Sequence, residues 1–394
     1  MSLCKGFTQG GSNADVVLAD AFVKNLTGGI DWATGYQAVL SDAESKHYRA
    51  PIFHLKLISQ VQPYEWSTSG RGGLESWKLL GYIPKEDWDP WGGALRTRSI
   101  SRTVEYAYDD FCLSLIARGL GYLRSSEKYL ARSRNWKNLF NPKQISPTLS
   151  TNFIGFLQPR HLNGTWGYQN PTTCSGYDFG YCSLDSEGNE TYEGSSWLYT
   201  FYVPQDMASL ITSLGGPEPF VNRLSYFHTS GLLYVGNEPA FLTIFQFHYG
   251  GRPGLSAFFS HSYIPSQFNA TSGGLAGNDD SGSIGSFTSL AMIGLYPVAG
   301  QDVYVVTPPY FPEVKVRSKQ SGKTATIRCI NFDSGYKNIY VQSAKLDGVV
   351  WEKNWVRHRF WMEGGTLELV LGSEESKWGT REEDLPPSSS TSGI

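Results

Sequence analysis

The chain has 394 residues, a formal net charge of −3 at pH 7 and an aromatic content of 14%, including 12 tryptophans. This nearly balanced charge excludes the broad basic surface that attracts nucleic acids or anionic membranes. The apolar stretches end well short of the roughly 20 residues of a membrane span, and the length allows a large core in one or two domains.

The first three-quarters of the chain are predicted to be helical. Apolar residues at helical spacing begin at Val16, and Asp31 begins a second helix that continues through Leu40. Further helices are predicted over residues 101–120, 127–139, 204–214, 219–227, 241–249, 254–260 and 282–295. The loops between them are long, notably 141–199, and long structured loops on a helical scaffold often carry function.

The pattern changes to short β-strands near residue 300. Runs rich in β-branched residues predict strands over 303–306, 314–316, 324–329, 339–342 and 367–370. The segment 373–394 is charged and then Ser/Pro-rich, which predicts a disordered tail. We therefore predict three regions: a helical region over 1–300, a β-strand region over 301–372 and the tail over 373–394.

One candidate catalytic residue is Glu193. It lies between Tyr192 and Gly194, just before an aromatic run that includes Trp197. A carboxyl group beside aromatic rings loses hydration, which raises its pKa and keeps a proton available at neutral pH. This is the profile of a general acid. The alternative is an ordinary solvated glutamate in a loop.

A second group of acids lies between Gly277 and Gly282. Asn278, Asp279 and Asp280 stand just before a predicted helix, where free backbone N–H groups stabilise an ionised carboxylate. An ionised carboxylate is suited to be a general base, and hydrolysis of a glycosidic bond needs one protonated and one ionised carboxyl group. Simple helix capping and calcium binding are the alternatives, although the spacing does not match an EF-hand loop.

Other polar clusters have less specific patterns. Asn237 and Glu238 lie in a turn before a helix, and an ordinary polar turn is the alternative there. Glu105 and Asp109 are one helical turn apart and repel unless a cation or an arginine lies between them, with Arg98 and Arg102 as possible partners. The histidines lack the spacing of a zinc site, and the motifs of phosphate binding and of acyl transfer are missing from the sequence.

Two sequence signals point to different cellular compartments. Sequons for N-linked glycosylation begin at Asn25, Asn163, Asn189 and Asn269, but the first residues contain no apolar signal core. Cys174 and Cys182 bracket a loop rich in Gly and Tyr and could pair in an oxidising compartment. Cys112 lies in an apolar helical pattern and is predicted to be a buried small residue.

Ordered motifs recur along most of the chain, up to about Trp378. They cover residues 10–19, 104–110, 155–160, 192–194, 203–206, 236–239, 277–282 and 294–298. In this order and spacing they resemble glycoside hydrolase family 92, the calcium-dependent exo-acting α-mannosidases. The resemblance implies an (α/α)6 toroid, here incomplete, whose loops form the site, followed by a small region of β-strands that completes a sandwich.

The resemblance also implies a reaction and its site. Terminal α-linked mannose would be removed from N-glycans or mannans with inversion, in a secreted protein or in the secretory pathway. An α-1,2 linkage is expected, with other linkages open. Glu193 matches the general acid and Asp280 the general base, helped by Asp279. Calcium would bind the sugar hydroxyls, with Asn237 and Glu238 in the segment that approaches it. The expected substrate-binding residues are Trp197, Asn278 and Arg160.

Departures from the family pattern keep other functions open. Members usually begin with a β-sandwich domain and the first toroid helices, whereas this chain begins inside the helical region. About nine predicted helices are fewer than a closed toroid requires, and the strands are expected to lack most of their sandwich partners. A non-catalytic sugar-binding protein or an inert truncated member of the same family is therefore an alternative. A toroidal polysaccharide lyase with a Tyr or Lys base is a third possibility.

Overall fold

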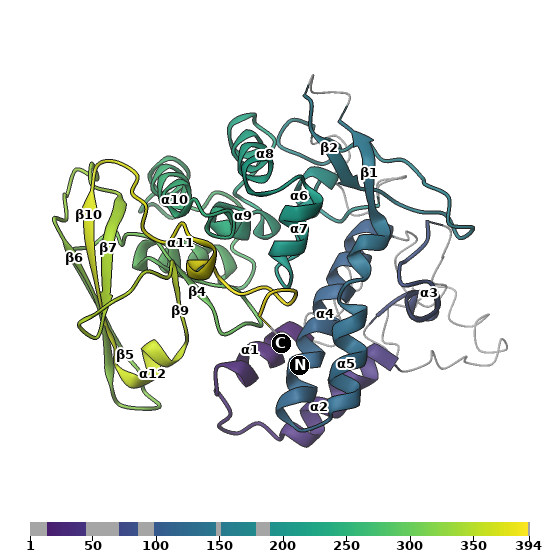
Figure 1. The fold of residues 1–394 in the computed structure, drawn as a ribbon, viewed down its shortest axis with the longest axis horizontal. Coiled ribbons are helices and arrows are strands. Elements are labelled where there is room, and N and C mark those ends of the chain that lie inside the picture. Colours follow the sequence, from purple (N-terminus) through teal and green to yellow (C-terminus); the bar gives the residue numbers. More distant parts are fainter. Residues whose placement is uncertain (1–13, 45–70, 86–97, 147–150, 179–189, 393–394) are drawn as a thin grey trace. The chain divides into compact units, whose positions relative to one another are not determined.

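A computed structural model describes residues 14–44, 71–85, 98–146, 151–178 and 190–392. The chain divides into two compact units, Met1–Gln205 and Asp206–Ile394. Helices occur in both units, so the predicted boundary at 300 marks only the change from helices to strands. Figure 1 shows this change along the colour scale, from helices coloured purple through green, up to α11 (Ser283–Ile293), to the green and yellow strands of the C-terminal part.

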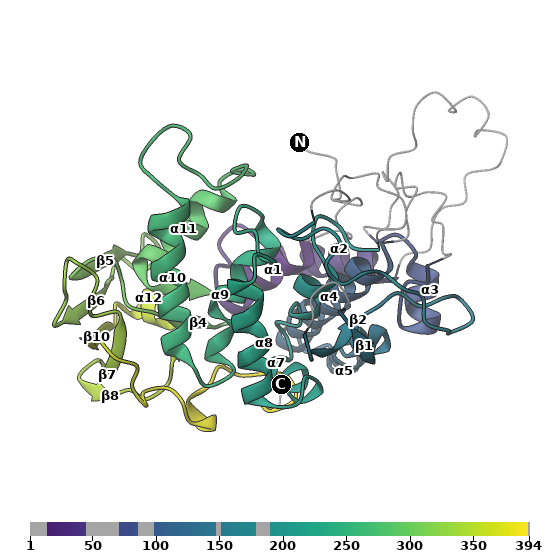
Figure 2. The same cartoon turned by 90° about the horizontal axis from the view of Figure 1, so that it is seen from above.

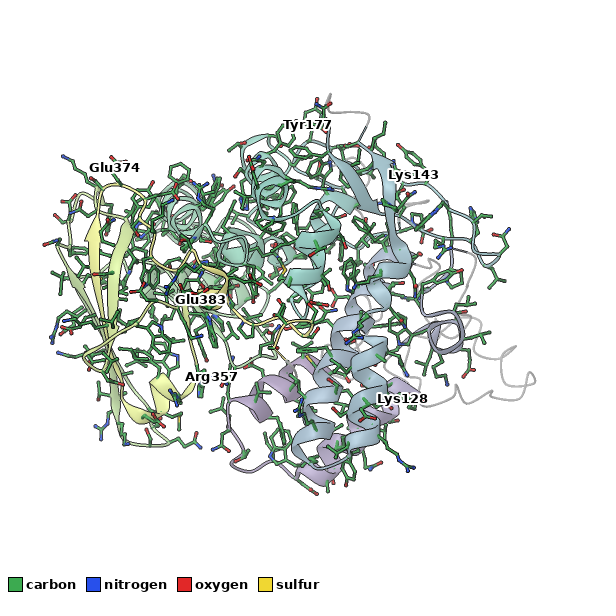
Figure 3. The ribbon with its side chains drawn as sticks, viewed as in Figure 1. Lys128, Lys143, Tyr177, Arg357, Glu374 and Glu383 are labelled. Atoms are coloured by element: carbon green, nitrogen blue, oxygen red, sulfur yellow. The ribbon has the colours of Figure 1, made fainter. Side chains whose placement is uncertain are left out.

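The first unit is built around the long helix α4 (Ser99–Gly119). Its other helices are α1 (Ala14–Val23), α2 (Trp32–Glu44), α3 (Leu74–Leu80), α5 (Leu123–Arg132), η2 (Asn135–Leu139) and α6 (Ser196–Thr200). Asp31 caps α2 by accepting hydrogen bonds from two of its first amides, as the sequence predicted. Lys128, labelled in Figure 3, is on α5 and reaches Glu44 of α2 at 2.8 Å.

A hairpin interrupts the helices of the first unit. Strands β1 (Phe140–Ile145) and β2 (Ile154–Leu157) pair antiparallel, inside the segment 141–199 that was predicted to be a loop. The prediction failed because β1 has the sequence Phe-Asn-Pro-Lys-Gln-Ile, which lacks the alternation of apolar and polar residues typical of a strand.

A buried cluster of charges connects the helices of the first unit. Arg71 is fully buried and donates a hydrogen bond to Asp110 of α4 at 2.6 Å. Its guanidinium group also lies 3.5 Å from Asp15 of α1 and 3.8 Å from Asp109. Arg132 of α5 bonds to the other carboxylate oxygen of Asp110 at 2.6 Å. Two arginines therefore hold the acids of α1 and α4 together.

This cluster explains how the closely spaced acids of α4 are tolerated. The sequence predicted that Asp109 needs an arginine or a cation beside it, and an arginine is present. The arginine beside Asp109 is Arg71, which was not among the candidates, and the burial of Asp109 excludes the alternative of a solvated helix face there. Arg98 instead donates to the carbonyl of Thr191 at 2.9 Å. The true partner comes from a distant part of the chain, which spacing along one helix cannot reveal.

Most helices of the second unit agree with their predicted positions to within a few residues. The helices are α7 (Met207–Ser213), α8 (Pro217–Thr229), η3 (Glu238–Ala240), α9 (Phe241–Phe245), η4 (Gln246–His248), α10 (Pro253–Gln267) and α11 (Ser283–Ile293). The run predicted as one helix over 241–249 is therefore an α-helix followed by a 3-10 turn. Helix α10 continues seven residues past its predicted end at 260, and η3 was not predicted. Proline at the first helical position begins both α8 and α10.

Two sheets and a short helix complete the second unit. The larger sheet has the order β5-β6-β10-β7-β8, with β6 and β10 parallel, and the smaller has the order β3-β4-β9. The strands are β3 (Leu295–Pro297), β4 (Tyr304–Val306), β5 (Glu313–Arg317), β6 (Thr324–Ile330), β7 (Tyr340–Leu346), β8 (Val349–Val350), β9 (Trp355–Val356) and β10 (Thr366–Gly372), and the helix is α12 (Arg359–Glu363).

The strands of the second unit share one buried apolar cluster, and the expectation that they lack most of their sandwich partners stays a prediction. Ile327 of β6 and Leu369 of β10 belong to one buried apolar cluster with Val306 of β4, Val356 of β9 and Phe360 of α12. The larger sheet therefore packs against the smaller sheet and α12. The sequence analysis missed β3, β8, β9 and α12 because they are only two to five residues long.

The segment predicted as a disordered tail is ordered over residues 373–392. Trp378 is buried in the same apolar cluster, and its indole N–H donates to the carbonyl of Trp351 at 2.7 Å. The hydroxyl of Ser388 accepts a hydrogen bond from the backbone of Ala208 in the first turn of α7 at 3.1 Å. The prediction of disorder was based on composition alone. Composition does not show that one tryptophan is buried in the core or that serines of this segment bond to the end of a helix.

The structure describes Cys112 and Cys174, and the predictions for these two cysteines have different outcomes. Cys112 is a fully buried free thiol on α4, which confirms that prediction. Cys174 is disulfide-bonded, while Cys182, its predicted partner, lies outside the described residues. Among the helices of the described ranges, none has the length and apolar character needed to cross a membrane.

Candidate active site

Glu193 lies in a sharply turned loop directly before α6. Its backbone has a φ of 47°, in the left-handed region that residues other than glycine rarely adopt. The next residue must be glycine-sized, because a Cβ atom on Gly194 would lie 2.9 Å from Leu198 and 3.0 Å from the ring of Tyr199. Ser195 then caps α6 by accepting from the backbone of Leu198. Strained backbone is common at functional sites, so this loop supports a role for Glu193.

Buried hydrogen bonds tie the Glu193 loop to the start of α4. The carboxylate of Glu190 accepts from the backbone N–H of Ser99 at 2.9 Å, and Arg98 donates to the carbonyl of Thr191. Gln169 donates to the hydroxyl of Thr191 at 2.8 Å and accepts from the backbone of Glu190 at 2.6 Å. All five residues are at most 5% exposed, so the frame around Glu193 is rigidly packed.

A second carboxyl group, that of Glu105 on α4, shares the surroundings of Glu193. Its Oε2 atom lies 3.5 Å from the hydroxyl of Tyr202, and burial raises the pKa of Glu105 to about 7. Burial also raises the pKa of Tyr199 well above its usual range, and the charges of Glu105 and Glu193 raise it further. Tyr199 therefore lies close to both carboxyl groups. The sequence analysis missed this because Glu105 and Glu193 are far apart in the chain.

Trp197 is a core residue, which corrects its prediction as a substrate-binding residue. Its side chain is 0% exposed, and its indole N–H donates to Ser146 at 3.0 Å. Phe153 and Phe156 pack edge-on against it, with ring centroids 5.7 and 5.0 Å away. The indole is therefore closed to a sugar. An aromatic residue near a helix start is as typical of a core as of a sugar platform, and the pattern alone did not separate the two.

The guanidinium group of Arg160 is engaged within its own loop. It donates to the carbonyl of Gly164 at 3.0 and 2.8 Å and to the carbonyl of Asn138 at 3.2 Å. It also lies 4.8 Å from the ring centroid of Trp166, whose side chain is 40% exposed. Arg160 therefore holds Trp166 in place. The exposed indole of Trp166 is a better candidate for sugar contact than either predicted residue, and no sequence signal distinguished it from Trp197.

The second candidate group lies before α11 in the second unit. The carboxylate of Asp279 accepts a hydrogen bond from the backbone of Gly285, the third residue of α11, at 3.1 Å. Asp280 is exposed with a φ of 45°, and its side chain makes no hydrogen bond or ion pair with any described residue. Asn278 is exposed in the same loop. The structure thus separates the two aspartates, because Asp279 caps the helix while Asp280 remains available for chemistry.

Two glycines hold this loop against the turn before η3. A Cβ atom on Gly277 would lie 2.0 Å from the carbonyl oxygen of Gly236, and one on Gly236 would lie 2.5 Å from the carbonyl oxygen of Ala276. Tyr234 donates a hydrogen bond to the same Ala276 carbonyl at 2.8 Å. The motifs 236–239 and 277–282 are therefore side by side. Figure 2 shows the connection from α10 to α11 as a long green loop.

Asn237 and Glu238 offer oxygen ligands of the kind that calcium prefers. Both are half-buried, and the contact between Gly236 and Gly277 brings the loop of Asn278 beside them. Within the described ranges, no group of three or more His, Cys, Asp and Glu side chains is placed to hold a metal ion. These oxygens therefore suit a calcium ion only if further oxygens, such as sugar hydroxyls, complete its coordination. The calcium site stays a prediction.

Gly277→Ala is expected to separate the two loops, because the added methyl group would overlap the Gly236 carbonyl. We expect a loss of about 1–3 kcal/mol in the free energy of unfolding, as for other overpacked sites, together with a marked loss of activity. Gly273→Ala is the control, since a Cβ atom there meets nothing within 4 Å. Urea unfolding checks the result, and equal stability of the two variants would contradict the close approach.

The two candidate carboxyl groups belong to different units, Glu193 to the first and Asp280 to the second. Their separation, expected to be roughly 6.5–9.5 Å in an inverting enzyme, therefore stays a prediction. A cavity of about 870 Å³ in the second unit is lined by Tyr249, Trp355 and Glu383 among others, and by none of the predicted site residues. Glu383 is labelled in Figure 3. The candidate site is thus defined by its loops and not by this cavity.

Comparisons with known proteins give the family. Residues 1–373 match the model of the glycosyl hydrolase family 92 catalytic domain. A curated relative, an uncharacterized secreted glycosidase of Arthroderma benhamiae, is 53% identical over 390 residues, which are 98% of this chain and 48% of the relative. The chain therefore belongs to glycoside hydrolase family 92.

Solved structures share the fold. The family GH92 α-mannosidase BT3965 from Bacteroides thetaiotaomicron is 25% identical with a TM-score of 0.76, over 96% of this chain and 44% of that one. The structure of its complex with mannoimidazole is also 25% identical to this chain, with a TM-score of 0.77, and the match covers 96% of this chain and 46% of that one. The family GH92 inverting mannosidase BT2199 from the same species is 23% identical to this chain, with a TM-score of 0.77, and the match covers 97% of this chain and 48% of that one.

These matches also show how much of the fold is shared. The chain spans about half the length of the relatives it matches. A helical region followed by β-sheets is common to this chain and the solved family members. Closure of the helices into a toroid stays a prediction.

Proposed function

We propose that this chain is the catalytic part of an inverting exo-α-mannosidase that removes terminal mannose from N-glycans or mannans. The observation that supports the proposal is the close contact between Gly236 and Gly277, because it joins the loop that contains Asn237 and Glu238 to the loop that contains the exposed Asp280. Family membership supplies the reaction class. The solved relative bound to mannoimidazole supports a mannose-containing substrate.

In this proposal the two carboxyl groups have opposite protonation states. Glu193 donates a proton to the glycosidic oxygen as the bond to the leaving group breaks, and Asp280 accepts a proton from the attacking water. Glu193 is half-buried between buried residues, Tyr192 among them, and Tyr199 lies close to its carboxyl group. Exposure of Asp280 suits an ionised base. Asp279 supports the base indirectly by fixing the start of α11.

Calcium is the proposed cofactor, held by Asn237 and Glu238. When bound, it would draw electron density from the sugar hydroxyls and favour a distorted ring. In this proposal Asn278 and Asn237, which follow the contacting residues Gly277 and Gly236, bind the substrate, and Trp166 is the exposed aromatic side chain of the first unit. We further propose that the protein is secreted, as the curated relative is described to be.

The test is to incubate the purified chain with α-1,2-, α-1,3- and α-1,6-linked mannobiose and to follow the product by proton NMR. Inversion releases β-mannose first, and treatment with a calcium chelator should abolish the release. Initial release of α-mannose would overturn the inverting mechanism. Binding of mannobiose in calorimetry without any release would instead support the non-catalytic alternative. The rates for the three disaccharides give the linkage preference.

A further inference from the structure

We propose that Asn163 and Asn269 carry N-linked glycans. Each begins an Asn-X-Thr sequon, and each lies in an exposed turn of the described chain. N-linked glycans are bulky and solubilising, and they are found on surface loops of secreted proteins. The inference is independent of the proposed reaction, since it concerns modification of this chain and not its activity.

The two sequons have the same local geometry. The Oδ1 atom of Asn163 accepts hydrogen bonds from the backbone N–H of Thr165 at 3.0 Å and from its hydroxyl at 2.7 Å. Asn269 accepts the corresponding bonds from Thr271 at 3.1 and 2.6 Å. The threonine hydroxyl of each sequon therefore contacts the amide group that would be modified. In both of these turns the asparagine and the threonine are exposed.

Asn170 provides a negative control within the same chain. Thr172 donates to Asn170 from its backbone at 3.2 Å and from its hydroxyl at 3.1 Å, so the turn closely resembles the other two. The middle residue is Pro171, however, and proline at this position prevents a sequon from being an acceptor. Thr172 is also 1% exposed. We therefore expect modification at Asn163 and Asn269 and none at Asn170.

Two observations support entry into the compartment where this modification occurs. Cys174 is disulfide-bonded, and disulfides form and persist in oxidising environments such as the secretory pathway. The relative from Arthroderma benhamiae, 53% identical to this chain, is described as secreted. The disulfide is a property of the structure, whereas the sequons are a property of the sequence, so the two indications are independent.

The modification requires an oligosaccharide linked to a lipid pyrophosphate as the sugar donor. The side-chain amide nitrogen of asparagine attacks the anomeric carbon and forms a new N–C bond. The bond from that carbon to the pyrophosphate oxygen breaks, and its electron pair leaves with the lipid pyrophosphate. The amide loses one proton, so atoms and charges balance without any oxidation or reduction.

The experiment is site-specific mass spectrometry of the chain made in a eukaryotic host with a secretion leader attached. Total cell protein and medium are both collected, so that retention in the cell does not hide the result. Enzymatic removal of the glycans in heavy-oxygen water converts each glycosylated asparagine into a mass-tagged aspartate. We expect tags at Asn163 and Asn269 and none at Asn170. Absence of tags at both Asn163 and Asn269 would overturn the inference.

Matched variants separate glycosylation from spontaneous deamidation. Thr165→Ala should remove the tag at Asn163 and leave the tag at Asn269, whereas Thr165→Ser should keep both. Thr165 is exposed, so neither change disturbs the core. A tag at Asn163 that persists in Thr165→Ala would contradict the assignment. The double variant Glu193→Gln with Asp280→Asn should carry the same glycan sites, so failure of the proposed reaction does not affect this test.

Discussion

Asp280→Asn is expected to lower the rate of mannose release by about 10²–10⁴-fold, the usual contribution of a general base, while Asp279→Asn keeps most of the activity. The two residues are neighbours and both changes remove one negative charge. They differ in role, because Asp279 caps α11 through Gly285, and asparagine is also a good capping residue. Equal losses in the two variants would contradict the assignment of the base to Asp280 alone.

Glu193→Gln should reduce the rate by a similar factor for mannobiose, for the matching reason that a glutamine cannot donate the proton. The loss should be much smaller for an aryl mannoside with an acidic leaving group, because such a group departs without protonation. Asp280→Asn should show no such recovery. Initial rates with both substrates, together with circular dichroism to verify folding, check this pair of results. Full activity of Glu193→Gln on mannobiose would exclude it as the general acid.

The second large effect concerns stability. Arg71→Met is expected to lower the free energy of unfolding by about 3–5 kcal/mol, because it leaves the acids around it buried without their shared partner. Trp77, whose indole N–H donates to Asp110 at 3.0 Å, lies at the cluster and can report unfolding of the first unit by fluorescence. The measurement is urea unfolding followed by tryptophan emission.

The control for Arg71→Met is Arg328→Met in the second unit. Arg328 pairs with Glu313 at 3.2 Å, but its side chain is 51% exposed, and exposed ion pairs contribute about 0–1 kcal/mol. Burial raises the pKa of Asp15 to about 7 and that of Asp109 well above its usual range, so protons neutralise part of the cluster. If protonation of these aspartates already removes the charges that Arg71 would balance, Arg71→Met will lower the free energy of unfolding by less than about 1 kcal/mol, and the expected value will be wrong.

Much of the fold follows from the sequence because its signals are local. Asp31 caps its helix with its own side chain, and the apolar face of α4 buries Val104 and Phe111 as its spacing predicts. The failures are non-local. Arg71 reaches the acids of α4 from outside that helix, and Trp378 anchors a segment whose composition alone predicts disorder. The spacing of apolar residues around Arg71 or Trp378 does not indicate either contact.

The candidate site shows the same limit. Residue type and neighbours were enough to select Glu193 and Asp280 as candidates. They could not separate Asp279 from Asp280, because the difference lies in which carboxylate turns toward the amide of Gly285. Residue type and neighbours also could not show that Trp197 is buried and Trp166 exposed, because both tryptophans have small and polar neighbours in the sequence. Such distinctions depend on the directions of side chains in the folded chain.

The contact between Gly236 and Gly277 also makes this enzyme family open to redesign. The backbones of the two glycines and the hydroxyl of Tyr234 connect the two loops, and none of these contacts comes from the side chain of Asn237 or Asn278. A combinatorial library at Asn237 and Asn278 would therefore vary the side chains of the proposed site while these contacts remain. Selection on different mannobioses could then yield variants with new linkage preferences without a search through the rest of the protein.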